Sequence, residues 1–368
     1  MHGWHDVLWA GPAVILAAII IGWGAETAQV YISQGLALAV LAWLQTLPEF
    51  AVEAVVAWNQ RQDLMIANLS GSLRLLVGLG WPLIYFTYAI LGKGRRDGKW
   101  PVIKLAAHNG LEVLVLFLGT LYFGVVWLKQ TLTVLDGALL FCIYFFYLWK
   151  LSSMPTGGHE DVEDLPWVGK KIIKMSPTLR NISILSIFVA GGFILQYAAH
   201  PFLNGLEAVA VMYGISTFVF IQWCAPFVSE FPEKITAFQW ARKGGRKVTM
   251  AMLNMVSSNI VQWTMMAGML PMIYSVSKGE ITSIYFDQHQ ETEILLTILQ
   301  SFLSVLFLMD LEFHFWDAFG LFLLWAIQFF VPDFREEIMY VYGIWIIAEI
   351  FILARNKKLT YAISKYRG

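Results

Sequence analysis

Two proline–glutamate pairs lie inside long apolar runs of this sequence, at Pro48–Glu49 and Pro232–Glu233. Proline has no backbone N–H, so each one deprives the carbonyl four residues earlier, on Leu44 or Val228, of its helical hydrogen bond. If the runs cross a membrane, each glutamate costs at least about 2.5–3.5 kcal/mol to insert, which makes it a functional candidate by default. Freed carbonyls beside a carboxylate present only oxygen ligands. This chemistry suits a hard cation.

Each pair is followed by a second polar segment, Asn-Leu-Ser-Gly-Ser at 68–72 and Asn-Met-Val-Ser-Ser-Asn at 254–259. Residues four apart share one helix face, so Asn68 and Ser72 face the same way, as do Asn254, Ser258 and Gln262. We expect the two asparagines to contribute to the cation site, with bracing of the broken helices as the alternative. The repetition of the whole pattern is the strongest functional signal in the chain.

The composition of the chain indicates the environment in which these motifs lie. The 368 residues are 58% hydrophobic and only 14% charged, with a net charge of −1. Soluble domains carry about 25% charged residues, so a soluble enzyme is excluded. A nucleic-acid partner is excluded because there is no excess positive charge. The sequence predicts an all-α polytopic protein in a lipid bilayer, with about eleven spans. The expected spans are 8–30, 36–60, 63–91, 103–128, 131–151, 181–199, 206–240, 247–275, 292–310, 314–331 and 336–354.

A polar stretch at 152–180 divides these spans into five and six. Because five is odd, the second copy of the motif enters the membrane from the opposite face. The sequence therefore predicts an inverted-topology repeat, with the site near the midplane where the repeats meet. The expected divisions are a first repeat (1–151), a loop (152–180), a second repeat (181–334), and an extra transmembrane helix with a basic tail (335–368).

The basic residues predict the orientation. Nineteen of the 25 Lys and Arg residues fall within 92–104, 150–180, 241–248 and 355–367, which lie on one side if the spans are counted as above. By the positive-inside rule this side is cytoplasmic. We therefore expect a multi-pass protein of the cell membrane with its N-terminus outside and its C-terminus in the cytoplasm.

The paired motifs resemble the alpha repeats of the sodium/calcium exchanger family, within the calcium:cation antiporter superfamily. In those repeats a (Thr/Ser)-Ser-x-Pro-Glu segment precedes a Gly-Asn-x-x-Gly-Ser-Asn segment. The similarity is motif-specific over 42–76 and 226–262, and topological over the ten spans from 8 to 331. The resemblance implies cation ligands at Glu49, Glu233, Gln45, Thr46, Ser229, Glu230, Ser72 and Ser258, and backbone carbonyl ligands at Ala42 and Pro226.

The sequence departs from the family pattern at several of these positions. The polar residue that the family places one turn after the third-helix serine is Leu76 in the first repeat and Gln262 in the second. Leu76 cannot ligate a cation. Lys234 directly follows Glu233, and it either pairs with Glu230 one turn earlier or occupies the place of an exchanged ion.

Arg74 adds a positive charge in the middle of a span. It lies about 200° around its helix from Ser72, so we expect it to point away from the site towards a buried acid, with Glu53 and Glu26 as candidates. The sharper alternative is that Arg74 takes the place of an exchanged ion. Five other acids lie in or near spans, and most of them are expected to be solvated at a span end: Glu112, Asp136, Glu207, Asp310 and Asp317.

The sequence thus predicts a secondary antiporter that exchanges a divalent cation, expected to be Ca²⁺, for Na⁺ or H⁺. It predicts no enzyme and no cofactor, only the transported ions, with Glu49 and Glu233 as the metal carboxylates. The alternative is a cation-sensing or scaffold relative that does not transport, which is favoured by the departures at Leu76, Gln262, Arg74 and Lys234. The sequence leaves the oligomeric state open.

Overall fold

The computed structural model describes residues 4–31, 34–92, 99–153, 162 and 165–367. Within these ranges the chain is mostly helical, and the expected all-α class is modified only by four strands of two residues each. The helices of the first half are α1 (Trp4–Gln29), α2 (Gln34–Gln45), α3 (Leu47–Trp58), α4 (Gln62–Leu75), the π-helical turn η1 (Leu76–Gly80), α5 (Trp81–Ile90), the 3-10 turn η2 (Ala107–Asn109), α6 (Gly110–Leu128), α7 (Val134–Ser152) and α8 (Trp167–Ile172). The helices of the second half are α9 (Pro177–Met212), α10 (Thr217–Ser229), α11 (Phe231–Lys243), α12 (Arg246–Val261), the π-helical turn η4 (Gln262–Met266), α13 (Ala267–Lys278), α14 (Gln288–Phe307), α15 (Phe315–Phe330), the 3-10 turn η5 (Pro332–Phe334), α16 (Arg335–Arg355) and α17 (Tyr361–Arg367).

The chain packs as two compact units. The first comprises Met1–Asn68 and Leu148–Glu233, and the second comprises Leu69–Tyr147 and Lys234–Gly368. Each unit takes segments from both predicted repeats, so the packing units cut across the repeat boundaries. The predicted repeats follow the order of the sequence, whereas each packing unit combines two separate segments of the chain.

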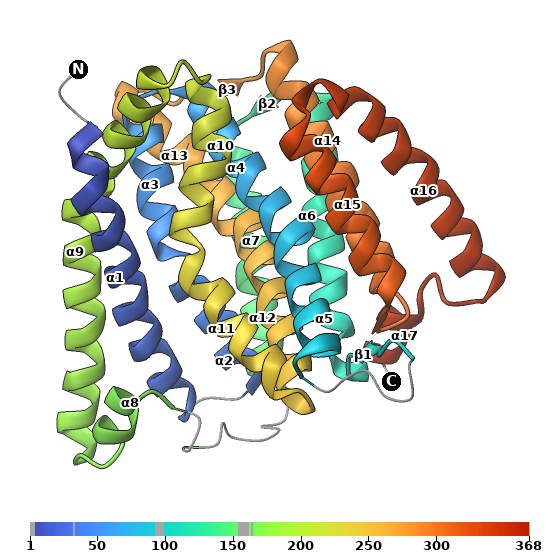
Figure 1. Cartoon of the computed structure of the whole chain (residues 1–368), viewed down its shortest axis with the longest axis horizontal. Helices are drawn as coiled ribbons and strands as arrows, with labels where there is room; N and C mark the ends of the chain where they lie inside the picture. The colour runs from blue at the N-terminus through green and yellow to red at the C-terminus, as the bar shows by residue number, and fades with distance from the viewer. Residues whose placement is uncertain (1–3, 32–33, 93–98, 154–161, 163–164, 368) are drawn as a thin grey trace. The chain divides into compact units, whose positions relative to one another are not determined.

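In the first unit, α1 and α9 lie side by side along most of their lengths (Figure 1). Two glycines of α9 permit this close approach: a Cβ atom on Gly191 would lie 2.6 Å from Ile21, and one on Gly205 would lie 2.6 Å from the backbone nitrogen of Val7. Small residues at such a seam let helix backbones come close together.

The expected break between the spans 181–199 and 206–240 is misplaced. Helix α9 continues through Pro201 to Met212, and α10 begins only at Thr217. Phe202 and Gly205 are buried beyond the proline, which is consistent with tertiary packing overriding the proline's tendency to end a helix.

In the second unit, two short strand pairs fix the direction of α6 against α14. Strand β1 (Ile103–Lys104), just before α6, pairs antiparallel with β4 (Glu312–Phe313), just after α14. Strand β2 (Thr131–Leu132), just after α6, pairs antiparallel with β3 (Ile284–Tyr285), just before α14. The start of each helix therefore lies at the end of the other, and α6 and α14 run antiparallel.

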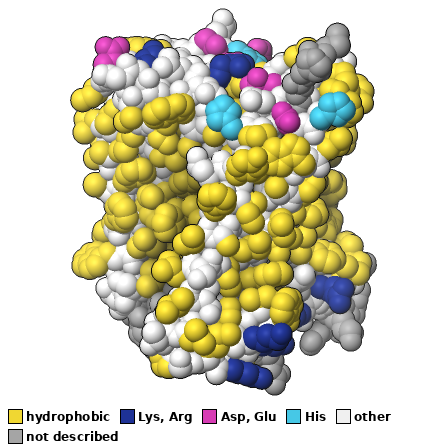
Figure 2. Space-filling view, turned by 90° about the vertical axis from the view of Figure 1, so that its left-hand side faces the viewer, with side chains coloured by type: hydrophobic (Ala, Val, Ile, Leu, Met, Phe, Trp, Pro, Cys, Tyr) yellow, Lys and Arg dark blue, Asp and Glu magenta, His cyan; other side chains and the backbone are white. Residues whose placement is uncertain are grey.

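The surface supports a membrane location. On the face that carries α1 and α9, hydrophobic side chains cover the middle, and charged side chains gather at the two ends (Figure 2). Six described stretches are long and apolar enough to cross a membrane, and two further apolar helices, Thr217–Ser229 and Phe315–Phe330, are shorter. Some expected spans are interrupted: 36–60 is split into α2 and α3, and 206–240 into α10 and α11 after the end of α9.

Candidate cation-binding site

The first predicted break is present, and it spans a single residue. Helix α2 ends at Gln45 and α3 begins at Leu47, with Thr46 between them at φ −84° and ψ −3°. Pro48 therefore stands at the second position of α3, where its missing N–H removes no interior helical bond. The Thr46 hydroxyl donates to the Trp43 carbonyl at 2.9 Å, which leaves its oxygen lone pairs available to a ligand.

The second break repeats this geometry. Helix α10 ends at Ser229 and α11 begins at Phe231, with Glu230 between them at φ −91° and ψ 2°. The Ser229 hydroxyl donates to the Ala225 carbonyl at 2.9 Å. Both breaks therefore aim a hydroxyl hydrogen back along the helix and keep the oxygen free to coordinate a cation.

The two carbonyls expected to be ligands already accept hydrogen bonds. The backbone N–H of Thr46 donates to the Ala42 carbonyl at 3.0 Å. The Pro226 carbonyl accepts the backbone N–H of Glu230 at 2.9 Å and a longer hydrogen bond from the Ser229 hydroxyl at 3.5 Å. A carbonyl oxygen has two lone pairs, so a cation at Pro226 would compete with the Ser229 hydroxyl.

The first unit holds both predicted metal carboxylates. Glu49 and Glu233 are fully buried, and Gln45, Thr46 and Glu230 are at most 3% exposed. Helix α3 packs against α10, so the elements that flank the two breaks are neighbours in this unit. Carboxylate, hydroxyl and amide oxygens are the kinds of donor that a hard cation prefers.

A further buried acid of this unit was missed as a site candidate. Glu53 stands one turn after Glu49 on α3 and is fully buried, and the Asn68 side chain is the polar group that faces it. Within the described part of the chain, neither carboxylate oxygen of Glu53 has a hydrogen-bond partner. The spacing of four residues from Glu49 is the signal that identifies it.

The second unit holds the other predicted side chains, Ser72, Asn254, Ser258 and Gln262, all of which are fully buried. Each predicted serine is followed four residues later by a π-helical turn, η1 after Ser72 and η4 after Ser258. Such turns occur often at functional sites. Leu76 and Gln262, where the sequence departs from the family pattern, are the first residues of these turns.

Arg74 has a different partner from either candidate. Its guanidinium forms an ion pair with Glu293 on α14 and donates to Gln328 on α15 at 2.9 Å. Arg335 on α16 also pairs with Glu293. The prediction that Arg74 pairs with Glu53 was wrong, because the acid that Arg74 binds, Glu293, lies 219 residues away in the sequence. The side chain of Glu26 lies outside those that the structure describes.

Lys234 is buried in the part of α11 that belongs to the second unit. Its expected pairing with Glu230 stays a prediction.

Two of the five other acids near span ends, Glu112 and Asp136, are buried and not exposed to solvent at the membrane interface. Glu112 is 4% exposed and Asp136 is 3% exposed, and Asp136 pairs with Lys129 and accepts from Tyr122 at 2.7 Å. Glu207 is partly exposed and accepts from Arg61 at 3.2 Å.

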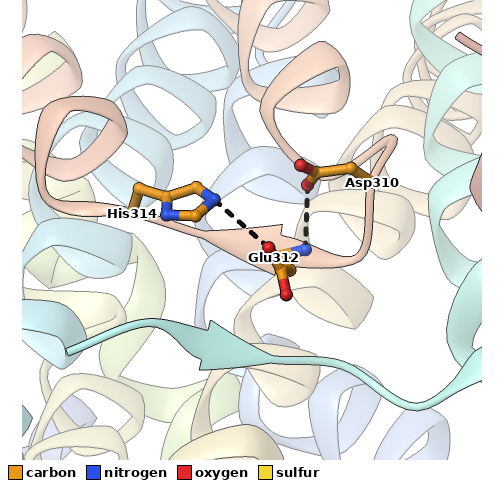
Figure 3. Close-up of side chains that lie close together, drawn as sticks. All are labelled: Asp310, Glu312 and His314. Atoms are coloured by element: carbon orange, nitrogen blue, oxygen red, sulfur yellow. Dashed lines mark hydrogen bonds and ion pairs between the residues drawn. The ribbon is translucent and has the colours of Figure 1, made fainter. Parts of the chain in front are cut away.

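One further group of potential metal ligands stands out among the described residues, formed by Asp310, Glu312 and His314 (Figure 3). Lys358 lies 3.2 Å from Asp310, and Lys104 lies 2.9 Å from Glu312. The Lys104 ammonium holds the pKa of the Glu312 carboxyl below its usual range. These two lysines make the group a charge network that anchors β1 and the chain after α16.

Comparisons with known proteins identify the family of the chain. The family model described as "Sodium/calcium exchanger protein" matches residues 7–152 and 183–332. The chain is similar to the crystal structure of the H⁺/Ca²⁺ exchanger CAX, with 30% identity, a TM-score of 0.90, and coverage of 100% of this chain and 92% of that chain.

More distant structures share the fold. The sodium-calcium exchanger NCX_Mj is 19% identical with a TM-score of 0.59, and the match covers 89% of this chain and 97% of that chain. Native YfkE is 14% identical with a TM-score of 0.63, and the match covers 86% of this chain and 88% of that chain. No curated protein sequence matches the chain.

The fold and the buried acidic breaks define a multi-pass membrane transporter of the antiporter class, and not an enzyme. More specifically, the chain belongs to the sodium/calcium exchanger family.

Proposed function

We propose that this protein is a secondary antiporter that moves Ca²⁺ across the cell membrane in exchange for H⁺, with Na⁺ as the alternative coupling ion. The observation that carries the proposal is the pair of matched helix breaks, each followed by a buried glutamate. The similarity to an H⁺/Ca²⁺ exchanger over the whole chain favours H⁺. So does Leu76, because the loss of an oxygen ligand weakens a site for several Na⁺ ions.

The ligands of the transported ion follow from the two breaks. Glu49 and Glu233 would hold Ca²⁺ together with the hydroxyls of Thr46 and Ser229, and the remaining ligands would come from the other predicted residues. Two carboxylates balance the charge of one Ca²⁺ or of two protons, so either load is neutral before it crosses the low-dielectric membrane interior. This equivalence explains how one pair of acids can exchange the two ions.

We also propose the inverted repeat of two five-helix units with an extra helix at the C-terminus. Support comes from corresponding positions that lie 181 residues apart: Ile103–Lys104 corresponds to Ile284–Tyr285, and Thr131–Leu132 corresponds to Glu312–Phe313. Under this correspondence the register of the β1–β4 pair becomes that of the β2–β3 pair. A twofold relation between the repeats produces such a register.

The boundaries proposed for these units are 1–151 and 181–334, with the loop 152–180 between them and the extra helix and tail at 335–368. The distribution of basic residues supports an external N-terminus and a cytoplasmic C-terminus.

The proposal is tested in vesicles that contain the purified protein, with either a pH gradient or a Na⁺ gradient imposed. We expect the pH gradient to drive uptake of radioactive Ca²⁺, and Glu49→Gln and Glu233→Gln each to abolish it. Glu337→Gln, at an exposed position of α16, is the matched control and should transport normally. Robust uptake by Glu49→Gln would reject the site. Uptake driven only by Na⁺ would reject H⁺ coupling.

The second candidate, a relative that senses cations or acts as a scaffold, draws on the buried Lys234 next to Glu233. A sensor would be stabilised by Ca²⁺ against thermal unfolding without any flux, and a scaffold would show neither effect. Flux with Ca²⁺-dependent stabilisation identifies the antiporter.

A further inference from the structure

Two buried acids occupy corresponding positions in the second unit, Glu112 in the first turn of α6 and Glu293 near the start of α14. Each acid lies three residues after a residue whose side-chain amide accepts a backbone hydrogen bond at the start of the helix. The Asn109 side chain accepts the backbone N–H of Ala106 at 2.9 Å, and the Gln290 side chain accepts that of Asp287 at 3.1 Å. Glu112 is 4% exposed and Glu293 is not exposed at all, so both carboxyls lie away from water.

The surroundings of Glu293 neutralise its charge fully. Arg74 from α4 pairs with one carboxylate oxygen, and Arg335 from α16 pairs with the other. Gln328 accepts from Arg74, and Gln300 donates to the Arg74 carbonyl at 3.1 Å. Removing one partner from such a buried network would leave an uncompensated charge, so this carboxylate stays ionised and fixed.

Glu112 has no counterpart of these two arginines. The residue that corresponds to Arg74 is Ile260, which stands two residues after Ser258 as Arg74 stands two residues after Ser72. Arg335 lies on α16, which is extra to the two repeats. Glu112 forms no ion pair within the described part of the chain, and its Oε2 atom has no hydrogen-bond partner there.

The polar groups around Glu112 are uncharged. The Asn109 side chain faces the carboxyl, and the Tyr147 phenol lies within electrostatic range of it. Basic side chains on the packed elements are engaged elsewhere: Lys247 of α12 lies over the ring of Trp240, and Lys365 of α17 lies over the ring of Tyr361. The other charged or titratable groups on elements packed against α6, or near the carboxyl, are His108 on η2, Arg246 on α12, Arg367 and Tyr366 on α17, His289, Glu291 and Glu293 on α14, and Tyr144 on α7.

We propose that Glu112 is a proton-binding site inside the membrane, separate from Glu49 and Glu233. A buried carboxylate with no cationic partner is strongly disfavoured, so the group takes up a proton and becomes neutral. Release breaks the carboxyl O–H bond, passes the proton to water at the start of α6 and leaves the carboxylate.

Tyr147, which lies within electrostatic range of Glu112, contacts a helix that carries predicted cation ligands. The Tyr147 hydroxyl lies 3.1 Å from the Ser257 hydroxyl, and Ser257 directly precedes Ser258 on α12. A change of charge at Glu112 therefore acts on α12 through two hydroxyl groups. Glu112 becomes a point at which pH adjusts the exchanger, in addition to the coupling ions at the central site. This role in transport rests on the proposed function, whereas proton binding at Glu112 does not.

The proton is detected directly by infrared spectroscopy of the purified protein in lipid bilayers, titrated with pH. We expect the wild-type protein to show the carbonyl stretch of a protonated carboxylic acid at neutral pH. Glu112→Gln should lack this component, and Glu337→Gln should retain it. Identical carbonyl bands in the wild-type protein and Glu112→Gln would overturn the proposal. This measurement needs no transport, so its failure and that of the antiporter function are distinguishable.

A second measurement tests the link to α12. Tyr147→Phe removes the hydroxyl that contacts Ser257 and lies within electrostatic range of Glu112, and we expect it to shift the pH midpoint of the Glu112 carbonyl band. Glu112→Gln mimics the protonated form, so Ca²⁺ uptake should persist at alkaline pH where uptake by the wild-type protein declines. Superimposable pH profiles of uptake in the two proteins would overturn the proposed effect on transport.

Discussion

Thr46 and Glu230 have nearly the same backbone conformation, and each is the single residue between two helices. Their φ angles are −84° and −91°, and their ψ angles are −3° and 2°. Each stands two residues before a proline and three before a buried glutamate. This region of φ and ψ is sparsely populated and is frequent at active sites. The matched pair indicates that the two breaks serve the same purpose.

Restoring the helix at a break should impair transport. We expect Pro48→Ala to let α2 and α3 join and to lower Ca²⁺ uptake by about 10- to 100-fold, because a shift of about 1 Å suffices for such a loss at a site. The measurement is the initial rate of uptake in vesicles at equal protein content.

Pro201→Ala is the matched control, since α9 runs unbroken through Pro201. Uptake by Pro48→Ala at the level of this control would show that the break is not needed.

The ion pairs of Glu293 should dominate the stability of the second unit. We expect Glu293→Ala to lower the free energy of unfolding by about 3–5 kcal/mol, because it leaves the guanidiniums of Arg74 and Arg335 buried without their carboxylate. Asp63→Ala disrupts the exposed ion pair with Arg61, and it should change the free energy of unfolding by no more than about 1 kcal/mol. Reversible unfolding in detergent measures both, and equal losses would contradict the assignment.

The pair of Lys104 and Glu312 should make the β1–β4 contact sensitive to acid. The pKa of Glu312 is lowered in the folded protein, chiefly by its hydrogen bond to Lys104. A lowered pKa adds stability above the unfolded value of 4.5, and this stability is lost as the pH falls through the folded pKa.

We therefore expect Glu312→Gln to speed hydrogen exchange of the Leu105 amide, which bonds to Leu311 at 2.8 Å, at neutral pH. At a pH below the folded pKa, wild-type protein and variant should exchange alike once intrinsic rates are corrected. A difference that persists in acid would show that the ion pair is not the cause.

Lys234 provides a test of the coupling ratio. If its ammonium takes the place of an exchanged ion, Lys234→Ala should change the number of coupling ions moved per Ca²⁺. The ratio follows from the ion gradients at which net Ca²⁺ flux stops in reconstituted vesicles. An unchanged ratio would reject this role and favour pairing with Glu230.

The sequence predicted the breaks well because proline and buried glutamate act locally. It did not predict the π-helical turns at Leu76 and Gln262, which carry no local signal. It also placed Arg74 beside the wrong acid, since the pairing with Glu293 depends on the packing of α4 against distant helices. The break expected near Pro201 is absent, since a helix packed along α1 tolerates the proline. Local chemistry was readable from the sequence, and long-range partners were not.

A structure of crystals soaked in Ca²⁺ tests the central claim most directly. The account predicts one strong density bound by carboxylate oxygens of both Glu49 and Glu233, at about 2.3–2.6 Å from each. Two carboxylates more than a helix width apart, or each bound to a neighbouring base with no ion between them, would contradict it.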